Sequence, residues 1–412
     1  MSIRRVPKSS KGEETWKRIY DSAQKLFLNQ GYHKTSILAI SRDSGVSPAT
    51  IYQYFESKDN IFEIILESFQ EEFFNLIKDA LSMRVSLDEK ISYMVNSFFD
   101  SIWKYKSEFK VYREAEFIDR NLAARFHQIL SDSLKNTFPM NNDLYPPVTL
   151  WFLIGPLMYI GTFWVLWNET EVPENVREVL KDFYVNGISK GEFKVDLNVY
   201  RILDKYSRIE EEPETKGERT RKTLLKSAEL LFGRNGFNNT SIHEIVSMSE
   251  CSVGAFYIYF KSKKDILMTL VDDTNKSLRH FMKICTAEIK DRRNIEIASY
   301  MAFLDFFRRH RNIYAIVREA EFVDKKISLE YYEKLQKAYF VPLEISIKNN
   351  EIRNMDIKSL AFILMGIGHL LGHSLLILGE TSKEDFRKYI DPLSELIFYG
   401  LNITEKGRGS IK

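Results

Sequence analysis

The sequence predicts an all-α fold made of two tandem units, and two observations support this prediction. First, the chain repeats itself, because Gly31-Tyr32 and Thr35-Ser36-Ile37 return as Gly236-Phe237 and Thr240-Ser241-Ile242, an offset of 205 residues. Second, apolar residues recur at helical spacing through most of each half, whereas short alternating runs joined by Asn-Gly or Asp-Gly turns are scarce. A period this long indicates a duplicated domain rather than a solenoid.

The duplication extends beyond the start of each half. Tyr52-Gln53-Tyr54-Phe55 returns as Tyr257-Ile258-Tyr259-Phe260, and Arg113-Glu114-Ala115-Glu116-Phe117 returns as Arg318-Glu319-Ala320-Glu321-Phe322. Because the offset is the same for both pairs, each half holds one copy of a larger unit. Any activity of one half is therefore present twice in cis.

The start of the first half predicts three helices in close succession. Gly31 ends the first helix as a C-terminal cap, and Thr35 or Ser36 caps the second. Gly45-Val46-Ser47 forms a tight turn, after which Pro48 stands where a helix accepts proline, in its first turn. The third helix is therefore expected from Pro48 to Tyr54.

Longer helices follow in the first half. Ser57 is expected to cap a fourth helix, whose apolar positions include Ile61, Ile65 and Phe69. The remaining predicted helices cover residues 87–105, 108–119, 121–138, 146–168 and 173–190.

Composition is that of a soluble protein with two or three domains. The 412 residues are 28% charged and 44% hydrophobic, and the net charge is +2, so any nucleic-acid surface must be a local patch. Cys251 and Cys285 are the only cysteines, which excludes a disulfide framework and a four-cysteine zinc site. The N-terminus lacks the apolar core of a signal peptide. We therefore expect a cytoplasmic protein without a cofactor.

Two apolar runs are long enough to cross a bilayer. Val148 to Trp167 is twenty residues without a charge, and Leu360 to Leu378 is nearly as apolar. Polar residues and glycines dilute both runs. We expect helices buried in a core or at a dimer interface, and no membrane span.

Two short helices joined by a glycine turn, after a longer supporting helix, form a helix-turn-helix pattern whose second helix can enter the DNA major groove. The order of residues is more specific. Phe27-x3-Gly31-Tyr32-x2-Thr35-Ser36-Ile37 is followed by Ile40-x4-Gly45-Val46-Ser47 and by Ile51-Tyr52-x-Tyr54-Phe55-x-Ser57-Lys58. This string resembles the tetracycline-repressor (TetR) family of bacterial regulators over residues 12–62, and again over about 217–267.

The resemblance implies two tandem TetR-like units, each with an N-terminal three-helix DNA-binding domain and a larger helical ligand-binding and dimerisation body. It implies a repressor that leaves a double-stranded DNA operator when a small molecule fills the body. On this basis the heads cover residues 1–56 and 219–261, and the bodies cover 57–205 and 262–412. An acidic linker, residues 206–218, joins the repeats.

The first head offers side chains suited to DNA. Gln53 can pair bidentately with adenine, and Thr50 can bond a phosphate or touch a thymine methyl. Lys58 adds charge where a helix dipole already favours phosphate, and Thr35 either does the same or only caps a helix. The basic arm Arg4, Arg5, Lys8 and Lys11 is a further candidate contact. The predicted interface of the first head is Thr35, Ser47, Ala49, Thr50, Tyr52, Gln53, Tyr54 and Lys58.

The substitutions in the second head all remove features that suit DNA binding. Glu250 replaces Gly45, which costs about 1–2 kcal/mol if the position needs a positive φ, and it places a carboxylate near phosphates. Ala255 replaces Thr50 and Ile258 replaces Gln53, so two hydrogen-bonding readers are lost. We expect backbone contacts and little base specificity from Thr240, Ser252, Gly254, Tyr257, Tyr259 and Lys263.

Two symmetries are compatible with the repeat. The repeats can pair with each other as an intramolecular pseudodimer on an imperfect palindrome, or two chains can form a homodimer with four heads. The linker is long enough for the first arrangement, since about 13 residues reach on the order of 40 Å. We favour the pseudodimer, because each repeat contributes one apolar helix that needs a partner.

The bodies are rich in aromatic residues, most of which are expected in the core. Those that line a pocket predict an apolar or aromatic effector. Glu114 and Glu116, with their counterparts Glu319 and Glu321, either form surface ion pairs or face the ligand. His369 and His373 have metal-ligand spacing, but no third ligand is evident, and a hydrogen-bonded buried pair is favoured. The predicted pocket residues are Trp103, Glu114, Glu116, Tyr159, Phe163, Glu319, Glu321, His369 and His373.

Two other functions compete with a ligand-responsive regulator. One is a ligand-sensing or protein-interaction module whose second helix-turn-helix has lost DNA recognition, for which Glu250 is the main support. The other is a metal hydrolase that uses His369 and His373. The sequence contains no nucleophile-and-base constellation and no phosphate-cradling glycine loop, so we do not expect an enzyme.

Overall fold

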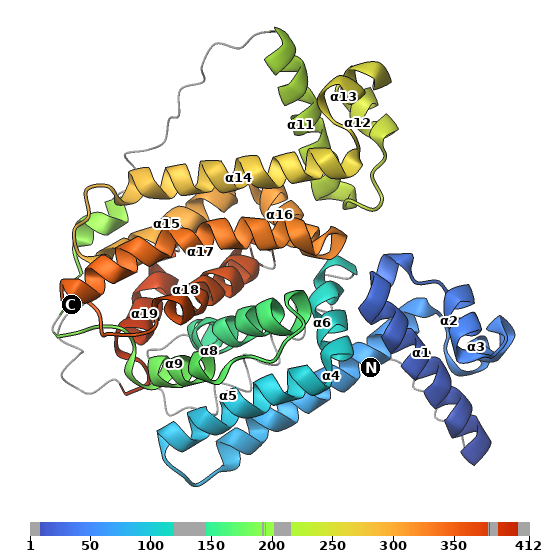
Figure 1. Cartoon of the computed structure of the whole chain (residues 1–412), viewed down its shortest axis with the longest axis horizontal. Helices are drawn as coiled ribbons and strands as arrows, with labels where there is room; N and C mark the ends of the chain where they lie inside the picture. The colour runs from blue at the N-terminus through green and yellow to red at the C-terminus, as the bar shows by residue number, and fades with distance from the viewer. Residues whose placement is uncertain are drawn as a thin grey trace. The chain divides into compact units, whose positions relative to one another are not determined.

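The computed structural model describes residues 9–118, 146–201 without Glu192 and Lys194, 216–377, Gly379 and 386–402. Helices make up every named element in these ranges (Figure 1). The only sheet-like pairing that they contain is an isolated bridge between Ser189 and Ile352. The predicted all-α class is therefore confirmed, and the predicted helix at 121–138 lies outside the described residues.

The chain forms two compact units that do not follow the repeat boundary. The first contains residues 1–139 and 161–172, and the second contains 140–160 and 173–412. The second unit thus includes a long apolar segment of the first repeat together with the whole second repeat.

The first unit contains the first head and the helices that support it. Its elements are α1 (Ser10–Lys34), α2 (Ile37–Ser44), α3 (Pro48–Tyr54), α4 (Lys58–Ser82), α5 (Leu87–Lys104), α6 (Lys106–Ile118) and the π-helix η1 (Thr162–Trp167). Gly31 has φ +78°, so the regular helix breaks there although α1 is drawn through it. Head core residues such as Phe27, Ile40, Ile51 and Phe55 are fully buried.

The second unit begins with two helices of the first repeat, α8 (Pro146–Gly161, whose last residue belongs to the first unit) and α9 (Glu174–Asn186). The 3-10 helix η2 (Leu197–Arg201) follows. The remaining elements are α11 (Lys216–Asn235), α12 (Ile242–Met248), α13 (Val253–Tyr259), α14 (Lys263–Thr286), α15 (Arg292–Arg309), α16 (Arg311–Val323), α17 (Lys325–Lys348), α18 (Ile357–Gly372), the π-helix η3 (His373–Ile377) and α19 (Phe386–Tyr399).

Local signals set the helix boundaries in both heads. Ser36, Ser47 and Ser57 cap α2, α3 and α4 by accepting a hydrogen bond from a first-turn amide, as the sequence predicts for Ser57. The corresponding serines of the second head cap α12, α13 and α14 in the same way: Ser241, Ser252 and Ser262.

The core of the second unit joins helices from both repeats. Gly155 of α8 lies so close to Gly366 of α18 that a Cβ atom on Gly155 would stand 2.6 Å from the Gly366 carbonyl oxygen. Near the ends of α9 and α19, Ile188 N donates to Ile397 O at 2.9 Å, and Leu401 N donates to Tyr184 O at 2.8 Å. Segments from the two repeats therefore pair through reciprocal backbone contacts.

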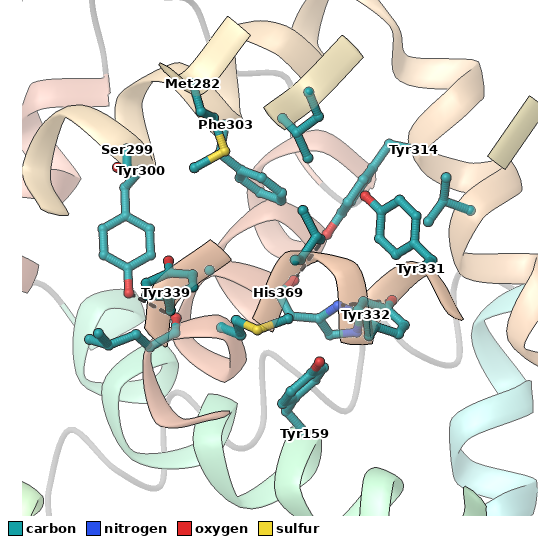
Figure 2. Close-up of a pocket in the computed structure, with 16 residues that line it drawn as sticks. Tyr159, Met282, Ser299, Tyr300, Phe303, Tyr314, Tyr331, Tyr332, Tyr339 and His369 are labelled. Atoms are coloured by element: carbon teal, nitrogen blue, oxygen red, sulfur yellow. Dashed lines mark hydrogen bonds between the residues drawn. The ribbon is translucent and has the colours of Figure 1, made fainter. Parts of the chain in front are cut away.

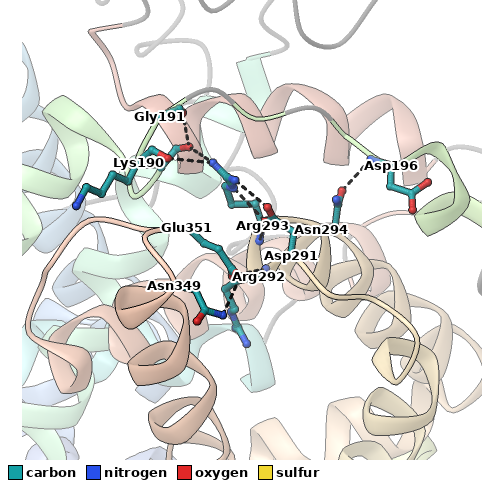
Figure 3. Close-up of polar contacts among 10 residues, drawn as sticks. Lys190, Gly191, Asp196, Asp291, Arg292, Arg293, Asn294, Asn349 and Glu351 are labelled. Carbon is teal, nitrogen blue, oxygen red and sulfur yellow. Dashed lines mark hydrogen bonds and ion pairs between the residues drawn. The ribbon is translucent and has the colours of Figure 1, made fainter.

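Polar contacts extend this pairing between residues 187–196 and the second repeat (Figure 3). Arg293 donates to Ser189 Oγ at 3.0 Å and to the Lys190 carbonyl at 3.3 Å. The Asp196 amide donates to Asn294 Oδ1 at 3.0 Å, and the Lys190 amide donates to the Glu351 carbonyl at 3.1 Å. These bonds fix the end of the first repeat onto α15 and the segment after α17.

The two long apolar helices lie in the core. Pro147–Trp167 is 94% buried and Ile357–Ile377 is 83% buried over the window that would suit a membrane span. Both are core helices of the folded chain, as the sequence led us to expect. Each changes from α-helix to π-helix near its end, at Thr162 and at His373, which the sequence did not predict.

Candidate nucleic-acid interface and effector cavity

The recognition helix of the first head, α3, presents a polar outer face. Ser47 Oγ accepts from the Thr50 amide at 3.1 Å and lies 2.9 Å from Thr50 Oγ1, while Ile51 is buried below. Ala49, Gln53 and Tyr52 are exposed, with 52% of Tyr52 accessible. Tyr54 is half-buried and packs against the head core. The predicted reading residues Thr50 and Gln53 are three positions apart and thus share one face of α3.

The recognition helix of the second head, α13, has the same frame but a more apolar outer face. Ser252 Oγ accepts from the Ala255 amide at 3.0 Å, and Phe256 is buried. Ile258 is 77% exposed and Tyr257 is 55% exposed, whereas Tyr259 is half-buried. Glu250 has φ +54°, close to the +68° of Gly45 in the first head. The expected left-handed turn is therefore kept with a glutamate in it.

Two residues predicted to meet phosphates point into the first head. Thr35 is only 2% exposed, and its hydroxyl donates to the Gly31 carbonyl at 2.8 Å. Lys58 Nζ donates to the carbonyls of Tyr32 at 2.9 Å and Thr35 at 3.1 Å, and it lies over the Tyr32 ring. Burial lowers the pKa of Lys58. These side chains build the turn, and two of the three N–H groups of Lys58 are used within it.

The second head repeats this turn. The Thr240 hydroxyl donates to the Gly236 carbonyl at 2.9 Å, and Lys263 Nζ donates to the carbonyls of Phe237 and Thr240, both at 2.7 Å. Burial lowers the pKa of Lys263 as well. Of the predicted basic arm, Arg4, Arg5 and Lys8 lie outside the described residues, and Lys11 is exposed.

A carboxylate, buried in the first repeat and half-buried in the second, attaches each head to its body. Glu114 Oε2 on α6 accepts from the Tyr32 amide at 3.2 Å, and Glu319 on α16 accepts from the Phe237 amide at 2.9 and 3.0 Å. Each amide follows a glycine with φ +78°, Gly31 or Gly236. Burial raises the pKa of both carboxyl groups. Glu114 and Glu319, predicted for the ligand pocket, therefore occupy the head–body junction instead.

Aromatic side chains of the second unit surround a cavity of about 70 Å³ (Figure 2). Tyr159 comes from α8 of the first repeat, and His369 comes from α18. Both belong to the predicted pocket set, and the structure places both at this cavity. The other lining residues are Leu278, Met282, Ser299, Tyr300, Phe303, Tyr314, Val317, Tyr331, Tyr332, Leu335, Tyr339, Leu364, Met365 and Gly368.

A small polar group lies at the wall of the cavity. Tyr332 Oη donates to the buried Glu321 at 2.7 Å and lies 3.4 Å from His369 Nδ1. His369 Nε2 is 4.0 Å from Glu321 Oε1. Burial raises the pKa of Tyr159 and Tyr332 well above the ordinary value, and Glu321 adds to both shifts. Both phenols therefore stay protonated at neutral pH. The Tyr332 proton is given to Glu321, so towards a ligand its oxygen can only accept a hydrogen bond.

Among the other predicted pocket residues, Trp103, Phe163 and His373 are not part of the lining of this cavity. Trp103 is half-buried beside Lys106, and Phe163 packs on Trp164 with ring centroids 4.7 Å apart. His373 is buried in η3, and the side chain of Glu116 lies outside the described residues. Within the part of the chain that the structure describes, no group of three or more histidine, cysteine or carboxylate side chains could hold a metal ion.

Both heads match the same family of known proteins. The family model described as "Bacterial regulatory proteins, tetR family" matches residues 19–65 and 224–269. Each match covers one head together with the start of the helix that follows it.

Individual relatives match one repeat rather than the whole chain. The HTH-type transcriptional regulator HbdR of Aromatoleum sp. is 32% identical over 103 residues, 25% of this chain and 42% of that protein. The uncharacterized HTH-type transcriptional regulator YdgC of Bacillus subtilis is 25% identical over 195 residues, 45% of this chain and 95% of that protein. A TetR-family regulator structure from Syntrophomonas wolfei has 22% identity and a TM-score of 0.41, over 44% of this chain and 96% of that one.

Two helix-turn-helix heads on helical bodies define a DNA-binding transcriptional regulator. The family match at both heads makes the assignment more specific. The chain belongs to the TetR family of bacterial regulators and contains the DNA-binding domain of that family twice.

Proposed function

We propose that the chain is a cytoplasmic repressor that leaves its operator when a small molecule enters the aromatic cavity. We further propose that the two repeats act as an internal pseudodimer on an imperfect palindrome. The observation that carries the proposal is the pairing of α8 and α9 with α18 and α19 inside one compact unit. Each repeat carries one head, so paired repeats would let a single chain present the two heads with which dimeric helix-turn-helix proteins read two half-sites.

The proposed release mechanism uses α16. Its Tyr314 and Val317 line the cavity, while Glu319 on the same helix accepts from the Phe237 amide of the second head. A ligand that moves α16 therefore changes the hydrogen bond that orients the head. Because the Glu319 carboxylate is half-buried, weakening that bond leaves a polar group without a good partner, and the head shifts to a new position.

Operator binding tests the proposal most directly. We would footprint the full chain on DNA upstream of its own gene at two salt concentrations, and measure the mass of the complex by analytical ultracentrifugation. We expect a protected imperfect palindrome, an affinity that falls steeply with salt, and one chain per site. Two chains per site would contradict the pseudodimer, and no protection at low salt would contradict operator binding.

A second candidate function is supported by α13 and the turn before it. Its exposed Ile258, and Glu250 in the preceding turn, are poorly suited to a polyanion. In this alternative the second head serves ligand or protein contacts, and only the first head binds DNA. Replacing Val253 to Tyr259 with the sequence of Pro48 to Tyr54 distinguishes the two. A large gain in operator affinity supports the alternative, and little change supports a second head that already contributes backbone contacts.

A further inference from the structure

A second pocket adjoins the aromatic cavity in the second unit. It lies along α14, α15 and α17 and has a volume of about 540 Å³. It shares four lining residues with the cavity: Met282, Ser299, Leu335 and Tyr339. The two spaces therefore lie next to each other, with these residues between them.

The second pocket carries positive charge without carboxylates in its lining. Its basic residues are Lys276, Arg279, His280, Lys283 and Arg292. Lys276 pairs with Asp272 at 2.7 Å, and Arg292 pairs with the buried Glu296. Arg279 bonds only the neutral Asn275, at 2.8 Å, and neither Arg279 nor Lys283 has an ion-pair partner among the described residues. Their charges are therefore available to an anion.

The first repeat lacks this charge pattern. At the 205-residue offset, Phe74 stands in place of Arg279, and Glu71 stands in place of Lys276. Lys78 corresponds to Lys283, so one cation of the pair remains. A basic pocket of this kind is thus a property of the second body, which predicts one high-affinity effector per chain.

Together the two spaces specify a ligand with two parts. The inner cavity of about 70 Å³ has room for roughly five water-sized groups, which suits one ring or a short chain. The protonated phenol of Tyr159 lines this cavity, and Tyr332, which donates to Glu321, offers it an acceptor oxygen. The outer pocket suits a carboxylate or phosphate, because guanidinium and ammonium groups bind both anions strongly.

We propose that the effector is an anionic amphiphile whose short apolar or aromatic part enters the tyrosine-lined cavity while its anionic group binds Arg279 and Lys283. This inference rests on the proposed function, because it takes the cavity as the effector site. It adds the charge of the ligand and a stoichiometry of one per chain.

Three compounds of similar shape test the charge. Phenyl phosphate, phenol and phenyltrimethylammonium would each be titrated into the full chain by isothermal calorimetry, with phenylacetate added to distinguish carboxylate from phosphate. We expect one phenyl phosphate or phenylacetate per chain, bound about tenfold or more tightly than the other two, since charge-assisted hydrogen bonds contribute that much. Equal or tighter binding of phenol or the cation, two sites per chain, or no binding of the anions at millimolar concentration would overturn the proposal.

A matched pair of variants locates the anion site. Replacing both Arg279 and Lys283 with alanine should remove the preference for the anion and leave phenol binding unchanged. The control replaces Lys337 and Lys348, two exposed α17 lysines that do not line either pocket, and should keep the preference. An unchanged preference in the Arg279→Ala, Lys283→Ala variant would also overturn the proposal.

Operator binding is measured on the same preparations, so that a wrong ligand class can be told apart from a wrong proposed function. A chain that binds its operator but does not favour the anion contradicts only the ligand class. A chain that fails to bind any operator contradicts the proposed function, whichever compound it prefers.

Discussion

The two heads share their inner frame and differ on their outer surface. Both have a glycine with φ +78° and a lysine that donates to two carbonyls of the turn. In both, a glutamate accepts from the amide of the residue after that glycine. On the outer face, Gln53 corresponds to Ile258 and Thr50 to Ala255. The comparison teaches that folding constrains the inward residues of a head, whereas DNA reading depends on a few outward ones that can change without loss of the fold.

Exchanging the outer residues should give the largest effect. Gln53→Ile in the first head should weaken operator binding about five- to 150-fold, because a bidentate base contact contributes about 1–3 kcal/mol. Ile258→Gln in the second head should change affinity by less than about threefold. The parent second head has no hydrogen-bonding reader at this position, so its half-site is not expected to present an adenine there. Fluorescence anisotropy at one fixed salt concentration measures both. Equal losses at the two positions would remove the proposed difference between the heads.

Removing the head–body carboxylates should have the next largest effect. Glu114→Ala and Glu319→Ala each leave a buried or partly buried amide without its acceptor, which costs about 1–3 kcal/mol. Faster hydrogen exchange at Tyr32 N–H or Phe237 N–H in the full chain reports the loss for each head separately. Exposed Glu344 on α17 provides a control, because Glu344→Ala should leave both amides unchanged. No change at either amide would contradict the attachment role.

The sequence predicted the heads well because their signals are local. The helix from Pro48 to Tyr54 has the predicted bounds, since Ser47, Pro48 and the following apolar positions all act within a few residues. The role of Glu114 could not be read from the chain, because its partner amide at Tyr32 is 82 residues away. A usable signal was the recurrence of both Glu114 and Gly31 at the repeat offset.

The proposed effector site was only partly predictable for the same physical reason. Tyr159 and His369 were identified as aromatic or buried residues of apolar helices, and both line the cavity. Arg279 and Lys283 were missed because an exposed cation on a helix is ordinary in sequence. Their place in a pocket becomes visible only when α15 and α17 supply its other walls. The comparison of Arg279 with Phe74, at the same position of the first repeat, then shows that the charge belongs to the second body.

Exchanging the turn residues should have a smaller and opposite effect on the two heads. Gly45→Glu forces a side chain into a left-handed turn and should destabilise the first head by about 1–2 kcal/mol. Glu250→Gly relieves the same conformation and should stabilise the second head by no more than about 1 kcal/mol, because the larger entropy that glycine loses on folding offsets part of the relief. Hydrogen exchange of α3 and α13 amides in the full chain measures each head. Changes of the same sign in both heads would show that the turn conformation is not the cause.

The smallest effect concerns the pH dependence of the two junctions. Burial raises the pKa of Glu114 and Glu319 above 4.5, so the folded state favours the protonated carboxyl. This contribution to stability is present below pH 4.5 and is lost as pH rises through the raised folded pKa. Glu319→Gln keeps an acceptor oxygen without charge, so the variant should be more stable than the parent above that window and lack the slope.

The two junctions should differ in the size of this slope. Lys110 lies near Glu114 and favours its ionised form, whereas Ala315 occupies the corresponding position in the second repeat. We therefore expect a larger gain from Glu319→Gln than from Glu114→Gln at neutral pH, measured as slower exchange of Phe237 N–H and Tyr32 N–H between pH 4.5 and 8. Glu244 in the same head is the control, because hydrogen bonds from Ser241 lower its pKa and its contribution is lost as pH falls. Parallel profiles for the parent and Glu319→Gln would mean that the carboxylate is as well solvated in the folded head as in the unfolded chain.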